Sequence, residues 1–342
     1  MPQKQKSAPE IRLSPIDFTS QGESVQRLIR SFAVKNIVHA YLLTGDAGLG
    51  KKSLARLLAQ SLFCENSDKA PCGECGECAR ILAGTHPDYF ELVPTKTKQL
   101  SVEDVRNFQE KIAVKSYEGG WRAIIIPNGD SMTPQAQNAL LKTLENPPEK
   151  NVFIVCACRS SSLLPTVLSR LRSIALLPYP LAAFVSQLSR RSIGEREAKK
   201  VYAVSGGSIG TAIAMLSDSD YMPLRDQISL SIPKLSSARD IASLSLALKE
   251  RKNDSDIIFS LIEQTIRTPL LAQSGSSDAR ELMLDYPLDW QKAAREERES
   301  SFVKMLEAVM EARKQSVSNV TFQAVLESLF YIISEEHNSW QR

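Results

Sequence analysis

The feature that most constrains this chain is a glycine-rich run, GDAGLGK at positions 45–51, which lies between an apolar segment at 40–44 and a helix-like segment at 53–63. Glycines permit a tight turn whose backbone amides and following helix N-terminus face an anion, and a lysine ammonium adds positive charge. The strand, loop and helix context predicts a phosphate-binding loop and disfavours a glycine turn without a nucleotide role. The expected phosphate-binding residues are Gly45, Gly48, Gly50 and Lys51.

The segments around this loop repeat the same pattern up to about position 180. Short apolar runs closed by turn residues alternate with helix-like segments of about 10–15 residues, which predicts βα units and a parallel sheet. Ser101, followed by Glu103 and Asp104, is a typical helix start, because a hydroxyl caps free amides and early acids suit the helix dipole. The expected strands are 40–44, 89–93, 123–127, 152–157 and 174–177, and the expected helices are 53–63, 102–112, 134–144 and 163–171.

The strand pattern stops after Pro178 and Pro180. Short amphipathic helices are expected at 181–188, 195–204 and 209–216, and a polar break follows at 217–220. Beyond it, apolar residues recur with the spacing of packed helices, as in Phe302, Met305, Leu306, Val309 and Met310 and again in Phe322, Val325, Leu326, Leu329, Phe330 and Ile333. The predicted organisation is a flexible tail at 1–15, an α/β domain at 16–180, a small helical domain at 181–218 and an all-helical domain at 219–342.

The loop lacks the groups that organise hydrolysis of a bound nucleotide. A Ser or Thr hydroxyl normally follows the lysine and holds Mg²⁺, but Lys52 stands there and Ser53 comes one residue too late. The strand at 123–127 should end in an acidic pair, yet Pro127 and Asn128 close it, with only Asp130 nearby. The sequence predicts that Mg²⁺-assisted hydrolysis is lost and leaves open whether Lys51 still holds a nucleotide.

Four of the six cysteines follow the spacing C-x7-C-x2-C-x2-C. Thiolates on tight turns can surround a tetrahedral Zn²⁺, and four sulfur ligands close the shell, which indicates a structural and not a catalytic site. His86 is interpreted as a structural residue, and Cys156 and Cys158 as small apolar residues of a buried strand. The expected zinc module spans 64–78 with the ligands Cys64, Cys72, Cys75 and Cys78.

Charge and hydropathy exclude several classes of protein. The net charge is +3, from 42 basic and 39 acidic residues, which is too balanced to indicate a nucleic acid or an anionic membrane as a direct partner. Glu74 and Glu77 further disfavour a nucleic-acid-binding zinc module, because they oppose phosphate contact. No apolar run is long enough to cross a bilayer and no apolar signal core opens the chain, so we expect a cytoplasmic protein.

Several stretches resemble the bacterial γ/τ and δ′ clamp-loader subunits over about residues 30–215. They are HAYL before the loop at 39–42, the zinc module directly after its helix, GTHPD at 84–88 and NALLKTLENPPE at 138–149. Leu168-Ser169-Arg170 is similar to the family's Ser-Arg-Cys motif, with Leu171 in place of the cysteine. The resemblance implies an AAA+ P-loop domain with an inserted zinc module, a helical lid domain and an all-helical collar domain that oligomerises.

The departures from the family pattern point to its δ′ branch. Besides the missing hydroxyl and acidic pair, a sensor threonine is absent near Ala157 and Cys158, and Gly207-Ser208-Ile209-Gly210 stands where a sensor arginine is expected. The resemblance then implies an ATPase-deficient stator in a heteropentamer with γ/τ and δ subunits. This complex, part of the DNA polymerase III holoenzyme, loads the sliding clamp onto primed DNA.

Within that family, Arg170 is implied to act as an arginine finger in trans, reaching the γ-phosphate held by a neighbouring subunit. Without the resemblance, a surface arginine that caps a helix C-terminus is the simpler interpretation. The other alternative for the whole chain is a catalytically active γ/τ-type ATPase whose missing groups come from Ser53 and Asp130.

Overall fold

The computed structural model describes residues 16–96, 98–113, 120–296, 298–316 and 320–338, and the predicted tail at 1–15 lies outside these residues. The chain divides into two units. One unit holds the described residues through Ala183 together with Ser208–Thr211, and the other holds Phe184–Gly207 and the described residues from Ala212 onward.

A five-stranded sheet forms the centre of the first unit. Its strand order is β2-β3-β4-β1-β5, and every neighbouring pair is parallel. This confirms the predicted parallel sheet and places β1 between β4 and β5. The strands are β1 (Ala40–Thr44), β2 (Tyr89–Glu91), β3 (Arg122–Ile126), β4 (Asn151–Ala157) and β5 (Arg172–Ala175).

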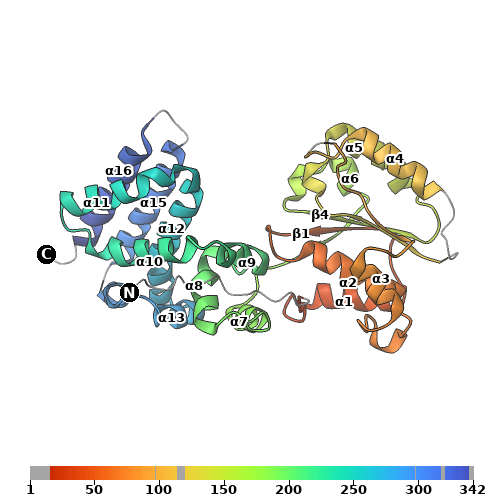
Figure 1. The fold of residues 1–342 in the computed structure, drawn as a ribbon, viewed down its shortest axis with the longest axis horizontal. Coiled ribbons are helices and arrows are strands. Elements are labelled where there is room, and N and C mark those ends of the chain that lie inside the picture. Colours follow the sequence, from red (N-terminus) through yellow and green to blue (C-terminus); the bar gives the residue numbers. More distant parts are fainter. Residues whose placement is uncertain (1–15, 97, 114–119, 297, 317–319, 339–342) are drawn as a thin grey trace, which may run out of the picture. The chain divides into compact units, whose positions relative to one another are not determined.

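Helices cover both faces of this sheet (Figure 1). Because side chains of a strand alternate between faces, Leu43 packs with the first group of helices and Leu42 with the second. The first group comprises α1 (Glu23–Ala33), α2 (Lys51–Phe63) and α3 (Gly76–Ala83). The second group comprises α4 (Val102–Ala113), α5 (Pro134–Glu145) and α6 (Pro165–Leu168).

Three helices differ from the sequence prediction. The helix expected at 163–171 is only the short α6, because a 3-10 turn at Ser160–Ser162 precedes it and β5 begins at Arg172. Helix α1 was not predicted, although its buried residues Val25, Leu28 and Phe32 have helical spacing. Helix α3 was also not predicted, because it lies inside the cysteine module, where the glycines suggest turns only.

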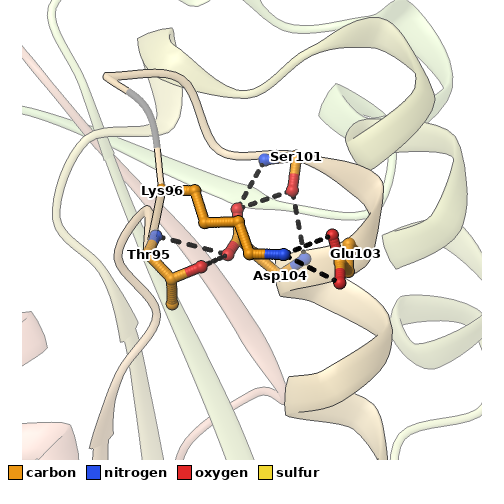
Figure 2. A network of polar contacts seen from close by, with 5 residues as sticks. All are labelled: Thr95, Lys96, Ser101, Glu103 and Asp104. Carbon is orange, nitrogen blue, oxygen red and sulfur yellow. Dashed lines mark hydrogen bonds and ion pairs between the residues drawn. The ribbon is translucent and has the colours of Figure 1, made fainter.

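The predicted helix start at Ser101 is confirmed, and Figure 2 shows its polar network. The Ser101 hydroxyl accepts a bond of 3.2 Å from the Asp104 amide, and the Asp104 carboxylate accepts one of 2.9 Å from the Ser101 amide. Thr95 donates to the same carboxylate through its hydroxyl at 2.5 Å. These bonds, first from Thr95 and then from Ser101, lower the pKa of Asp104 to about 2.

The second unit contains only helices among its described residues. Trp290 is fully buried and donates its indole N–H to the Ser229 carbonyl at 3.0 Å. The predicted apolar stripes are largely confirmed as core, since Phe302, Met305 and Val309 of α15 are buried, as are the α16 residues Val325, Leu329 and Phe330. Met310 was wrongly included, because it is 61% exposed. No described helix is both long and apolar enough to cross a membrane.

The helices from residue 181 onward are α7 (Leu181–Ser189), α8 (Glu195–Ser205), α9 (Ile209–Ser217), α10 (Tyr221–Ser231), α11 (Ala238–Leu248), α12 (Ser255–Gln273), α13 (Ser277–Met283), α14 (Leu288–Glu296), α15 (Glu299–Gln315) and α16 (Phe322–Asn338).

Candidate phosphate loop, cysteine cluster and arginine

The glycine-rich loop connects the carboxyl end of β1 to α2, at the edge of the sheet where open α/β proteins bind ligands. Gly50 is the N-cap of α2 and has a φ of 94°, a left-handed conformation that favours glycine. The local fold expected for a phosphate-binding loop is therefore present at 45–51.

The Lys51 side chain is turned onto its own loop. Its ammonium donates to the carbonyl oxygens of Gly45 at 2.5 Å and Asp46 at 2.8 Å, and it lies 3.6 Å from the sulfur of Cys158.

Cys158 is exposed, so its interpretation as a buried small apolar residue was wrong, because β4 ends one residue before it. Cys156 is buried within β4 as expected, and burial raises its pKa to about 12.

Lys52 occupies the position of the missing Mg²⁺-binding hydroxyl, and its ammonium is already paired. It lies 2.8 Å from the Glu91 carboxylate, which also accepts bonds from Arg56 at 2.9 Å and from the Tyr89 hydroxyl at 2.7 Å. Burial favours the neutral form of Glu91, but these three donors, led by Lys52, lower its pKa overall. A cationic side chain engaged in this way cannot replace an oxygen ligand of a metal ion.

Asp130, the other group considered for metal binding, already accepts hydrogen bonds from two backbone amides and a hydroxyl. Its carboxylate accepts bonds from the amides of Cys158 at 2.5 Å and Arg159 at 3.3 Å and from the Ser162 hydroxyl at 2.7 Å. Burial raises the pKa of this carboxyl, and the bonds from Cys158, Ser162 and Arg159 outweigh burial and lower it. Asp130 therefore fixes the turn after β4, and most of its acceptor capacity is taken up there.

The four predicted metal ligands come together after α2. The sulfur atoms of Cys64, Cys72, Cys75 and Cys78 all lie within 4.8 Å of one another, a spacing compatible with the ~3.8 Å between sulfurs of a tetrahedral zinc site. Backbone amides, that of Glu74 first, lower the pKa of Cys72 to about 7, whereas burial raises the pKa of Cys64 and Cys78. These four sulfurs can hold one metal ion, whose charge would offset the cost of burying thiolates.

Two side chains, those of Gln60 and His86, attach this cluster to the sheet domain. The side-chain amide of Gln60 on α2 donates to the Cys78 carbonyl at 3.0 Å. His86 accepts a bond from the Asp88 amide on Nδ1 and places Nε2 at 2.9 Å from the Glu77 carboxylate, while its ring packs on Phe63. His86 is therefore a structural residue and not a fifth ligand, as the sequence indicated.

Arg170 follows the short helix α6 and is partly exposed. Its guanidinium donates to the Thr166 carbonyl at 2.6 Å and to the Ser169 hydroxyl at 3.2 Å. It also forms an ion pair of 2.5 Å with Glu145, the last residue of α5. The helix-capping contact considered for Arg170 is thus present in the isolated chain. The sequence gave no signal for the Glu145 pair, because 25 residues separate the partners.

The phosphate loop also contacts Ser208–Thr211, which belong to the same unit. The sequence drew attention to this stretch only because a glycine stands there in place of an arginine. The structure shows the Gly210 amide donating to the Gly48 carbonyl at 2.9 Å. No sequence pattern could have indicated this contact across more than 160 intervening residues.

Comparison with known proteins relates part of this chain to one family. Residues 20–180 match the family model described as "DNA polymerase III, delta subunit". The DNA polymerase III subunit delta' of Haemophilus influenzae is 36% identical over 170 residues, which are 49% of this chain and 52% of that protein. The subunit delta' of Bacillus subtilis is 25% identical over 320 residues, which are 92% of this chain and 96% of that protein.

A second subunit type of the same enzyme is also similar. The DNA polymerase III subunit tau of Escherichia coli is 36% identical over 156 residues, which are 45% of this chain and 24% of that protein. The chain spans about half the length of the delta' relatives at 36% and 38% identity, namely 52% and 54%. The family-model match, residues 20–180, covers the part of the chain that carries the loop and the cysteine cluster.

Proposed function

We propose that this chain, which is similar to delta' subunits of DNA polymerase III and whose residues 20–180 match the delta-subunit family model, works as the δ′ subunit of a clamp loader. In this role it assembles with γ/τ and δ subunits into a heteropentamer in the cytoplasm, which places the sliding clamp on primed DNA. The tau relatives support a place among clamp-loader subunits. One observation carries the δ′ assignment. Near the phosphate loop, Lys52 is paired with Glu91 and Asp130 accepts bonds from the turn after β4, so neither is available to organise hydrolysis.

The chain contributes no ATPase of its own in this proposal. Hydrolysis needs Mg²⁺ and an oriented water, and the groups that would supply them are absent or occupied. Lys52 is paired with Glu91, and Asp130 holds the turn after β4. The rival function, a γ-type ATPase that uses Asp130, is disfavoured because that carboxylate already accepts three bonds.

The cysteine cluster holds structural zinc in this proposal. Four sulfurs complete a tetrahedral shell and leave no position for a reacting water, so the metal stabilises the fold. Residues 181–218 form the lid domain and residues 219–342 the collar domain that assembles the ring. The described residues of both stretches form helices and no strands, as this proposal requires.

Arg170 acts in trans as an arginine finger. A guanidinium meets phosphate oxygens with a planar pair of donors and stabilises the charge of phosphoryl transfer. Three contacts, to Thr166, Ser169 and Glu145, hold it at the end of α6. A neighbour's nucleotide would compete with Glu145 for the guanidinium, since both are anionic.

The test is the ATPase rate of a reconstituted clamp loader that contains Arg170→Ala. We expect normal ring assembly and a lower rate in the presence of clamp and primed DNA. A finger can contribute ~10³-fold at its own site, and the total decrease is smaller because the other sites keep their fingers. Arg170→Lys should restore little, because an ammonium lacks the planar fork.

Arg172→Ala is the matched control, because Arg172 is an exposed arginine two residues further on, in β5. Gel filtration of each complex shows whether assembly is equal. A full rate with Arg170→Ala in an assembled complex would leave Arg170 as a helix cap only. Failure of this chain to join γ/τ and δ subunits would contradict the clamp-loader role itself.

A further inference from the structure

Residues 208–211 form a close contact with the phosphate loop. The Ser208 hydroxyl donates to the Ala47 carbonyl at 2.9 Å, and the Thr211 hydroxyl donates to the same oxygen at 3.2 Å. The Gly210 amide donates to the Gly48 carbonyl at 2.9 Å. Ser208 is only 2% exposed, so its side chain is shielded from water. Three hydrogen bonds therefore join this segment to two consecutive peptide groups of the loop.

The two backbones can approach this closely only because both contact positions are glycines. A Cβ on Gly210 would lie 2.8 Å from the Gly48 Cα and 2.9 Å from its carbonyl oxygen, closer than real Cβ atoms come to backbone. A Cβ on Gly48 would lie 2.6 Å from the Thr211 amide nitrogen. Any larger residue at either position must separate the segments. This accounts for the glycine at position 210 by packing.

The loop is also engaged by its own lysine and by the N-terminal segment. The Lys51 ammonium, which would neutralise phosphate charge, bonds the carbonyl oxygens of Gly45 and Asp46. On Gly50, a Cβ would lie 3.0 Å from the Ile16 side chain and 3.4 Å from the Phe18 ring, so apolar groups pack directly against the loop there. Protein groups thus bond the carbonyl oxygens of four consecutive loop residues, Gly45 to Gly48, and pack against Gly50.

We propose that residues 208–211 are the built-in occupant of the phosphate loop and exclude the phosphate chain of a nucleotide from it. The lost hydrolysis concerns Mg²⁺ and water, whereas this contact concerns binding itself. A nucleotide could enter only after the bonds to Ala47 and Gly48 break and Lys51 leaves its carbonyl partners. The contact does not depend on the role of Arg170, so the two proposals can fail separately.

The experiment uses the full chain and two readouts. Isothermal titration with inorganic tripolyphosphate, the phosphate part of ATP alone, measures access to the loop. Hydrogen–deuterium exchange of the amide at position 210, which donates to the Gly48 carbonyl, measures whether the contact is open. For the wild-type chain we expect slow exchange and no binding tighter than about 1 mM.

Gly210→Ala should open the contact, because its new methyl group meets Gly48, while alanine itself suits a helix. We expect faster exchange of the amide at position 210 and binding of tripolyphosphate at least about tenfold tighter than in the wild type. The double variant Ser208→Ala/Thr211→Val removes two hydrogen bonds without added bulk and should change both readouts in the same direction. It replaces Gly210→Ala if that variant does not fold.

Gly194→Ala is the matched control, because Gly194 has an ordinary φ of -64° and a Cβ there meets nothing closer than 3.7 Å. It should behave as the wild type. Equal binding of tripolyphosphate by wild type and Gly210→Ala would overturn the proposal. So would faster exchange without binding, because another feature would then exclude phosphate, and so would unchanged exchange, because the contact would then not hold the loop.

Discussion

The phosphate loop and the cysteine cluster both lie next to α2, one at each end of the helix. They differ in how many of the side chains that their motifs require are present. The loop keeps its backbone turn and its lysine, but the side chains that would bind Mg²⁺ are replaced or engaged in other contacts. The cysteine cluster keeps all four ligands within 4.8 Å of one another. The difference teaches that the backbone of a motif can persist without the motif's metal-binding side chains when that backbone is also needed for packing.

The reason lies in what each region does for the fold. A metal shell with three ligands leaves a buried thiolate without its counter-charge, so every ligand matters for stability. The phosphate loop instead connects β1 to α2 and touches residues 208–211, and these contacts need its glycines but no Mg²⁺ ligand. The proposed loss of hydrolysis would therefore remove none of these contacts.

The largest effect should follow from loss of a metal ligand. Cys75→Ser should reduce bound zinc from about one per chain to nearly none and lower the free energy of unfolding by more than about 3 kcal/mol. Elemental analysis and denaturant unfolding measure the two quantities. Cys158→Ser is the matched control, because Cys158 is an exposed cysteine outside the cluster, and it should change neither. Full stability of zinc-free protein would remove the contrast between the two regions.

A smaller effect should follow from loss of the loop lysine. Lys51→Ala should lower the free energy of unfolding by about 1–3 kcal/mol, because two carbonyl oxygens lose a charged donor in a poorly exposed site. The purified chain should show only background ATP turnover both before and after this change. Urea unfolding and a steady-state ATPase assay test the two statements.

Lys52→Ala is the control for the stability loss expected in Lys51→Ala. Its ion pair with Glu91 is half exposed and Glu91 keeps Arg56 and Tyr89, so we expect a loss below about 1 kcal/mol. If Lys51→Ala abolished a steady turnover of the wild-type chain, the loop would still be a catalytic site and the contrast with the cysteine cluster would be wrong.

The smallest of the three main effects calibrates these values at a site that touches neither region. Asp104→Asn at the start of α4 should cost about 1 kcal/mol at pH 7, since the carboxylate accepts bonds from Thr95 and Ser101. Because the pKa of Asp104 is lowered from 3.8 to about 2, its stabilisation is complete above pH 4 and is lost as the pH falls through 2. Wild type and variant should therefore converge near pH 2.

Denaturant unfolding between pH 2 and pH 7 measures this dependence. Glu103→Gln is the control, because Glu103 lies in the same helical turn but forms only an exposed pair with Lys96. It should change stability by no more than about 1 kcal/mol. A pH-independent difference between wild type and Asp104→Asn would show that the carboxylate's charge is not what stabilises this helix start.

Local patterns in the sequence determined much of this protein. The glycine spacing at 45–51 specified the turn after β1, and alternating apolar segments specified the parallel sheet, because both depend on backbone geometry over a few residues. The cysteine spacing brought four ligands together for the same reason. Helix α1 also had a readable signal in its buried residues.

The tertiary structure alone decided which partner each polar side chain takes. The pairs Lys52 with Glu91, Asp130 with Ser162 and Arg170 with Glu145 join elements that are distant in the chain. The contact of Gly48 with Gly210 joins segments still further apart. Such pairs depend on strand order and on the path of each connection, and a short-range pattern contains neither. The sequence therefore showed which groups were missing from the loop, and the fold showed what occupies their place.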